Sequence, residues 1–199
     1  MKDLLIACAD VGSVANGNFG WADSDGAGGD NPSELAACVA SALQAGRPVA
    51  LGFECPLFIP LPDSERDLGR GRAGEGSRPW SAGAGCGALA TGLVQAIWTL
   101  SEVRKASPQA CMAYLAWNVF VDAGSGLLLW EAFVSGAAKG NGHRDDARLA
   151  VEAFAARMPN PATDITAPNP VSLAGFALLR AGWPLGLEAL RTACIAIKA

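Results

Sequence analysis

The chain has 199 residues and a formal net charge of -4, with 51% hydrophobic and 17% charged residues. This composition is typical of one globular domain, here expected over 1–199, and it argues against disorder. The acidic balance excludes a broad basic surface that would hold nucleic acid by charge alone, although a bound metal ion can offset local acid charge.

We expect neither a membrane span nor a signal peptide, because the first apolar run, 4–9, is short and no longer one is evident. The six cysteines contain no C-x-x-C pair, and most lie among apolar residues. This pattern favours buried free thiols over a zinc site. Together these features predict a cytoplasmic protein that does not bind membranes.

Apolar runs predict buried strands at 4–10 and 48–54, the second nearly continuous, as in a sheet covered on both faces. Between them, 17–22 is typical of another strand. The segment 32–44 predicts a helix, because it opens with proline and has serine and glutamate in its first turn. The next segment, 56–82, is rich in Pro, Gly and Arg and predicts a long functional loop.

A helix of small residues is expected at about 85–105. The segments 115–122 and 127–134 predict two strands of a hairpin, because Asp-Ala-Gly-Ser-Gly between them is a strong turn signal. The last third predicts helices at 143–157 and 171–181 and a final strand at 193–198. Alternating strands and helices indicate an α/β fold with a mixed central sheet flanked by helices.

Two predicted strands end on a carboxylate, Asp10 and Glu54, and Asp145 and Asp146 open the helix at 143–157. An acid at the end of a buried strand is costly to desolvate unless it is compensated. Acids from separate elements can meet at one sheet edge, and hard cations such as Mg²⁺ and Mn²⁺ prefer oxygen ligands.

Each acid also has a simpler interpretation. Asp145 and Asp146 could stabilise the helix dipole, by about 0.3–1 kcal/mol each. Asp10 could be a turn residue, and Glu54 could pair with an arginine of the loop. Glu54 is the hardest to explain in this way, because glutamate is depleted in strands and is rarely buried without a partner.

These motifs, in this order, resemble the ribonuclease-H-like superfamily, especially a poorly characterised branch of predicted nucleases. The resemblance spans nearly the whole chain in short motifs, whose order is the informative feature. The first is a strand ending in Asp, followed by a Gly-containing hairpin, here Ile6–Asp10 and Gly17–Ala22. The second is a strand ending in an acid before Pro-Leu and an arginine loop, here Gly52–Leu57 with Arg66. An Asp-Ala helix at Asp146–Ala150 and a Ser-Leu-Ala-Gly-x-Ala-Leu-Leu run at Ser172–Leu179 complete the series.

The resemblance implies a ribonuclease-H-like fold and a nuclease in which Asp10, Glu54 and Asp146 hold Mg²⁺ or Mn²⁺, with Asp145 assisting. Paired ions about 3.5–4 Å apart can activate water for phosphodiester cleavage. The expected partner is nucleic acid. The alternative is a non-catalytic domain of the same fold that binds a nucleotide or a protein partner.

The fourth ligand stays open. Holliday-junction resolvases of this superfamily often carry another Asp three residues into the last helix, where this chain has Arg148 or Leu149. The candidates are Asp145, Glu131, which matches an acid often seen in the fifth strand of this branch, and Asp122, which its turn context makes a weaker choice.

The arginines of the loop, Arg66, Arg70 and Arg78, could clamp phosphates, because guanidinium matches phosphate in a bidentate manner, or they could simply be solvated. His143 could serve as a general acid or base, or be a solvated loop residue.

The tryptophans divide in the same way. Trp80, within the arginine loop, is the best candidate for stacking on a base. Trp98, Trp117 and Trp130 lie in apolar runs and are expected in the core.

Overall fold

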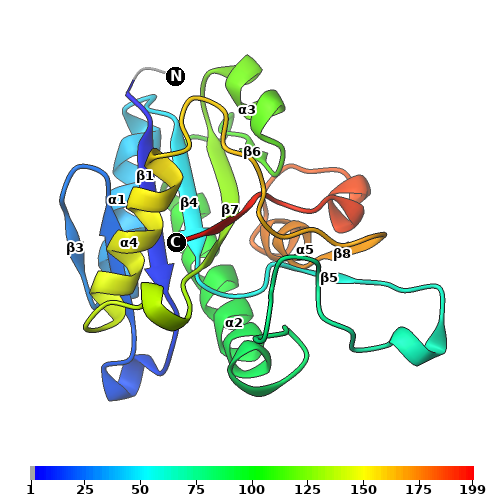
Figure 1. Cartoon of the computed structure of the whole chain (residues 1–199). Helices are drawn as coiled ribbons and strands as arrows, with labels where there is room; N and C mark the ends of the chain where they lie inside the picture. Colours follow the sequence, from blue (N-terminus) through cyan, green and yellow to red (C-terminus); the bar gives the residue numbers. More distant parts are fainter. Residues whose placement is uncertain (1–2) are drawn as a thin grey trace.

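The computed structural model describes residues 3–199 and contains a mixed central sheet in the order β3-β2-β1-β4-β7-β6, with β9 also paired to β7 (Figure 1). The hairpin strands β1, β2 and β3 are antiparallel, and β4, β7, β6 and β9 run parallel to β1. The strands are β1 (Leu5–Asp10), β2 (Gly20–Asp23), β3 (Gly28–Gly29), β4 (Val49–Phe53), β6 (Ala113–Tyr114), β7 (Leu127–Phe133) and β9 (Ala196–Lys198).

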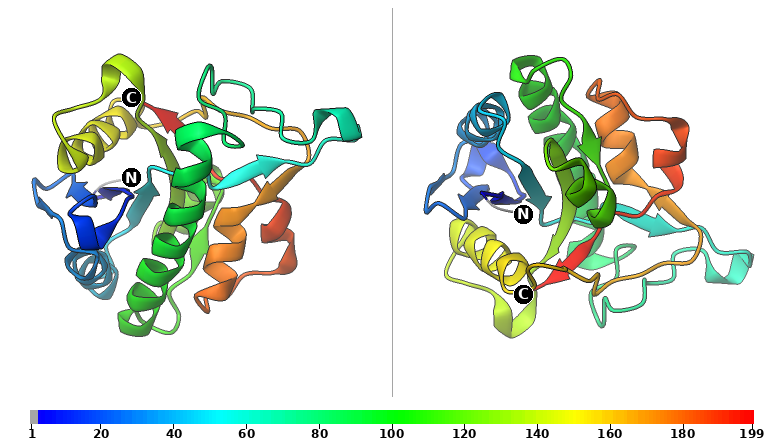
Figure 2. Two further views of the ribbon diagram at one scale, coloured as in Figure 1. Left: turned by 90° about the horizontal axis from the view of Figure 1, so that it is seen from below. Right: turned by 90° about the horizontal axis from the view of Figure 1, so that it is seen from above.

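Helices cover both faces of this sheet, which confirms the predicted α/β class (Figure 2). The helices α1, α2 and α5 lie on one face, and α4 lies on the other with the short α3. Two further strands, β5 (Phe58–Pro60) and β8 (Pro170–Ser172), form a separate antiparallel pair. The helices are α1 (Pro32–Gln44), α2 (Gly83–Ala106), α3 (Trp117–Ala123), α4 (His143–Ala155) and α5 (Leu173–Arg180).

The central strands β1 and β4 are almost wholly apolar because both contribute to two cores. In β1, Leu5, Ala7 and Ala9 face the core under α1 and α2, and Ile6 and Cys8 face the core under α4. Successive side chains of a strand point to opposite faces, so both sets are buried. The acid at the end of β1 is therefore placed where two layers of helices meet the sheet.

The predicted hairpin at 115–134 is wrong. The segment 117–123 is the helix α3, and the strand next to β7 is the short β6, which runs parallel to it. The glycine taken as part of a hairpin turn, Gly124, has φ 68° and ends α3 in the left-handed conformation. A glycine after an apolar run signals a helix C-terminus as well as a turn.

The long helix α2 departs from the expectation of no candidate membrane span. It has the length and the mean hydropathy, 1.2 over 18 residues, of such a span, and 22% of that window is buried. Length and composition alone do not make a helix membrane-spanning, because helices of globular proteins pass the same test.

The three tryptophans expected in the core differ in burial. Trp98 on α2 is 43% exposed, contrary to that expectation, Trp117 is half-buried, and Trp130 is fully buried as expected.

The six cysteines are free thiols, as predicted. Their burial is less uniform than expected. Cys8, Cys55 and Cys194 are buried, whereas Cys86 is exposed and the other two are half-buried.

Candidate metal centre

Three of the predicted ligands meet at one edge of the sheet. Asp10 is the last residue of β1, and Glu54 directly follows β4, its parallel neighbour. Asp146 lies in the first turn of α4, which packs against β1 and β2. One carboxylate oxygen from each acid lies within 4.8 Å of the other two. The strand ends and the helix start therefore form the acid cluster, a term used below for Asp10, Glu54 and Asp146.

A glycine allows α4 to approach the sheet closely enough for this arrangement. Gly20 pairs with Asp10 across the β1–β2 ladder. A Cβ atom at Gly20 would lie well inside van der Waals distance of the backbone of His143 and Arg144. The absence of a side chain at this position is therefore what lets the first turn of α4 rest on β2.

Replacing Gly20 with alanine is expected to destabilise the protein by about 1–3 kcal/mol, because the added methyl group must push the start of α4 away from the sheet. Urea denaturation measures the change. Gly87→Ala in α2 is the matched control, because its Cβ would meet open space, and alanine there should stabilise the helix by about 0.5–1 kcal/mol. Equal effects of the two substitutions would contradict the assigned role of Gly20.

Two of the acids are held by neighbours from the α4 region. Asp10 Oδ2 lies 2.6 Å from His143 Nδ1. Asp146 uses both oxygens: Oδ1 accepts from the Gly140 amide at 2.6 Å, and Oδ2 lies 2.8 Å from Lys139 Nζ. The first residue of α4 therefore fixes Asp10, and the loop before α4 fixes Asp146.

Glu54 is the least satisfied member of the acid cluster. Its Oε1 lies 3.7 Å from Lys139 Nζ, which is beyond hydrogen-bonding distance. Its Oε2 is buried and has no hydrogen-bond partner among the described residues. A buried carboxylate oxygen without a donor is costly, and a cation beside it would remove that cost.

Burial and mutual repulsion dominate the electrostatics of the acid cluster. Burial, and then the charges of Asp10 and Asp146, raise the pKa of Glu54 from its usual 4.5 to about 9, against the opposing charge of Lys139. Burial also raises the pKa of Asp10, although the hydrogen bond from His143 opposes this change. The cluster thus carries more carboxyl groups than its own cations neutralise.

The metal-free protein is expected to lose stability through Glu54 as the pH rises. Because its folded pKa lies above the unfolded value, the contribution of Glu54 is complete below about pH 4.5 and is lost as the pH rises through about 9. Urea denaturation in EDTA should show wild-type stability falling relative to Glu54→Gln between about pH 5 and about pH 9. Parallel pH profiles for the two proteins would contradict this assignment.

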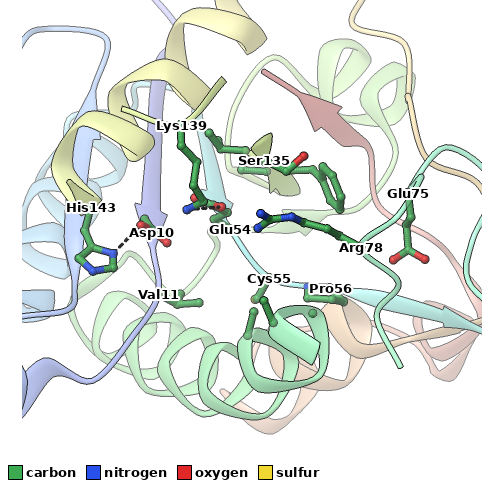
Figure 3. A pocket seen from close by; sticks show the side chains of 16 residues that line it. Asp10, Val11, Glu54, Cys55, Pro56, Glu75, Arg78, Ser135, Lys139 and His143 are labelled. Atoms are coloured by element: carbon green, nitrogen blue, oxygen red, sulfur yellow. Dashed lines mark hydrogen bonds and ion pairs between the residues drawn. The ribbon is translucent and has the colours of Figure 1, made fainter. Parts of the chain in front are cut away.

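A pocket of about 200 Å³ opens beside the acid cluster. Its wall includes Lys139, His143 and Arg78, and Figure 3 shows the guanidinium of Arg78 pointing toward Glu54 and Lys139. One of the three predicted phosphate-binding arginines is thus at the site.

The other two arginines lie outside the lining of this pocket. Arg70 is exposed and pairs with Asp67 at 3.3 Å, and Arg66 is exposed in the same stretch of the loop. Figure 1 shows this stretch extending away from the sheet. Trp80, the predicted stacking residue, is half-buried, and its indole nitrogen donates to the Arg70 carbonyl.

Asp145, the predicted assisting acid, lies outside the acid cluster. Its side chain is 40% exposed, accepts from the Asn141 amide at 3.3 Å and lies 3.7 Å from Arg148. This position agrees with the alternative interpretation of Asp145 as an acid that stabilises the start of a helix.

Glu131, a candidate for the fourth ligand, lies outside the acid cluster and forms a buried ion pair instead. It lies in β7 and forms a bidentate pair with Arg72, with both N–O distances at 2.7 Å and both side chains at most 1% exposed. Arg72 also donates to Glu75 at 2.8 Å and to the Phe58 carbonyl at 3.0 Å, and the Leu57 amide donates to Glu131 at 2.8 Å. This buried ionic network fastens the arginine loop to the sheet.

Sequence reasoning missed Lys139 and Arg72. Lys139 lies in a Gly/Asn loop with no periodic pattern, and Arg72 was one arginine among several in the long loop.

The donor set fits a hard divalent cation. It consists of carboxylate oxygens, one of which is buried without a partner, and it contains no thiolate. No family model, curated protein or solved structure matches this chain. The assignment of function therefore depends on the site itself and on the motif resemblance.

Proposed function

We propose that this protein is a Mg²⁺- or Mn²⁺-dependent nuclease with a ribonuclease-H-like fold. The observation that carries the proposal is the convergence of Asp10, Glu54 and Asp146 from three separate elements. Beside an open pocket, Glu54 Oε2 is buried and has no partner in the part of the chain that the structure describes. A divalent ion bound there would supply an activated water and would stabilise negative charge on a phosphodiester.

The surrounding residues have roles that suit this chemistry. Asp10 fixes the ring of His143 through Nδ1, while 37% of the histidine side chain stays exposed. A ring held in this way can carry a proton to or from a group in the pocket. Arg78, whose guanidinium points into the pocket, can hold a phosphate oxygen.

The order of the elements supports the ribonuclease-H-like part of the proposal. The first strand ends in Asp10 and leads into an antiparallel hairpin, the parallel strand beside it ends before Glu54, and the late helix carries Asp146. Three of the motifs on which the sequence resemblance is based thus contribute an acid to the cluster, whereas Arg66 lies outside the lining of the pocket. Fold alone does not determine function, so the chemistry of the site has the greater weight.

The direct test is a cleavage assay on single-stranded and duplex DNA and RNA with Mn²⁺, Mg²⁺ or EDTA. We expect metal-dependent cleavage that Asp10→Asn abolishes.

One observation favours the non-catalytic alternative: Lys139 already compensates part of the acid cluster without a metal. Absence of cleavage with every substrate, together with ligand binding that is the same in EDTA, would support that alternative and contradict the nuclease.

A further inference from the structure

Lys139 compensates one part of the acid cluster, and another part has no partner among the described residues. The first lies beside Asp146 and Glu54, where Lys139 Nζ is 2.8 Å from Asp146 Oδ2 and 3.7 Å from Glu54 Oε1. The second lies toward Asp10 and the unpartnered Glu54 Oε2. A protein cation thus compensates the first part and leaves the second open.

We propose that Lys139 is the built-in second cation of this site, so that the chain binds one divalent metal ion rather than two. The single ion would be held mainly by Asp10 and Glu54. Asp146 would contribute chiefly by holding Lys139. This inference rests on the proposed function, because it specifies how the same acid cluster is completed.

The hydrogen bonds of Asp146 support this division. Oδ2 lies against Lys139, and Oδ1 accepts from the Gly140 amide at 2.6 Å. A second metal ion at Asp146 would have to displace one of these donors. An ion beside Asp10 and Glu54 displaces neither, and it gives Glu54 Oε2 the partner it lacks.

Charge balance leads to the same stoichiometry. When a metal is bound, its carboxylate ligands are ionised, and the three acids and Lys139 taken by themselves then carry a net charge of -2, which one divalent ion neutralises. Two ions would leave a surplus of two positive charges at a largely buried site, where an uncompensated charge is costly. Among the described residues no fourth acid joins the cluster, and Lys139 takes the place that a second metal ion and its ligand would need.

The position of Lys139 also suggests the class of ligand. Its side chain is 40% exposed and lines the same pocket as Arg78. The ammonium and guanidinium groups therefore face one cavity from opposite sides, which suits the oxygens of a phosphate ester. Lys139 is thus a positioning residue for both the acids and the substrate phosphate.

Mn²⁺ titration with isothermal calorimetry and with the EPR signal of free Mn²⁺ counts the bound ions without an activity assay. We expect about one ion per chain for the wild type and for Lys139→Arg, and about two for Lys139→Met, which frees Asp146 Oδ2. Lys105→Met is the matched control, because Lys105 is an exposed lysine paired with Glu102, and it should bind one ion.

A second pair of variants tests the same point if Lys139→Met does not fold. Asp10→Asn should lower Mn²⁺ affinity by more than about 100-fold, and Asp146→Asn by less than about 10-fold. Any of three results would overturn the role of Lys139 and leave the nuclease proposal standing. These are two ions bound to the wild type, one ion bound to folded Lys139→Met, and equal losses of Mn²⁺ affinity for the two Asp variants. No binding to the wild type would overturn both.

Discussion

Glu131→Ala is expected to destabilise the protein by about 3–5 kcal/mol, as measured by urea denaturation. The substitution removes the bidentate partner of Arg72, whose side chain is fully buried, and leaves the Leu57 amide without its acceptor. Glu75 continues to pair with Arg72, but it does not reach the two nitrogens that Glu131 uses. The loss of β7's link to the arginine loop should therefore dominate the effect.

Two controls define this effect. Glu102→Ala removes an exposed pair with Lys105 and should change stability by less than about 1 kcal/mol. Glu131→Gln keeps the shape and two acceptor sites on one oxygen, so it should cost less than Glu131→Ala. Because Glu131 is not in the acid cluster, Glu131→Gln should leave Mn²⁺ affinity unchanged; a loss of binding by the folded variant would return Glu131 to the set of metal ligands.

Asp10→Asn is expected to lower Mn²⁺ affinity and metal-dependent cleavage by more than about 100-fold, yet leave the metal-free protein at least as stable as the wild type. Asparagine keeps an oxygen that can accept from His143 and removes a charge that raises the pKa of Glu54. Loss of activity and unchanged or improved folding would then occur in the same variant. Calorimetry and urea denaturation in EDTA measure the two parts separately.

Asp145→Asn provides the comparison for this variant. Asp145 lies next to a ligand in sequence, but it is half-exposed and outside the acid cluster. Its substitution should leave Mn²⁺ affinity and cleavage within about twofold of the wild type, since it removes only a surface charge near a helix start. A loss comparable to that of Asp10→Asn would show that the assisting role predicted from the sequence is correct.

The acid cluster could be predicted from the sequence because each of its acids is marked by the residues next to it in the chain. Asp10 and Glu54 each end an apolar run, and parallel neighbouring strands bring their ends to one edge of the sheet. The start of α4 was visible from its acids and the preceding Gly/Asn loop. The motif resemblance also favoured Asp146 over Asp145 as the ligand, and the structure places Asp146 in the cluster and leaves Asp145 half-exposed. The reason lies in the packing of α4 on β2 at Gly20, which the sequence alone does not show.

Contacts between distant segments were the part that sequence reasoning did not reach. Arg72 and Glu131 are 59 residues apart, and nothing in either segment marks them as partners. The suggested pair between Glu54 and a loop arginine is not found among the described residues: Arg72 pairs with Glu131, and Glu54 Oε1 lies 3.7 Å from Lys139 Nζ. Which charged side chains pair with each other depends on the packing of the whole fold.

The error at 115–134 has a local cause. Trp117-Asn118-Val119-Phe120-Val121 is rich in residues that favour strands, yet it forms α3, where Phe120 is buried against Trp117 and Tyr114. Intrinsic preference for a strand was overridden by tertiary packing, as is common for short segments.

The most direct test of the metal centre is a crystal structure of the protein soaked in Mn²⁺, with diffraction data collected at the manganese absorption edge. We expect one anomalous peak within coordination distance of Asp10 and Glu54, with Lys139 still in contact with Asp146. The same experiment on Asp10→Asn should give no peak there. An empty acid cluster in the wild type at saturating Mn²⁺, or a peak only elsewhere in the molecule, would contradict a metal centre formed by these acids.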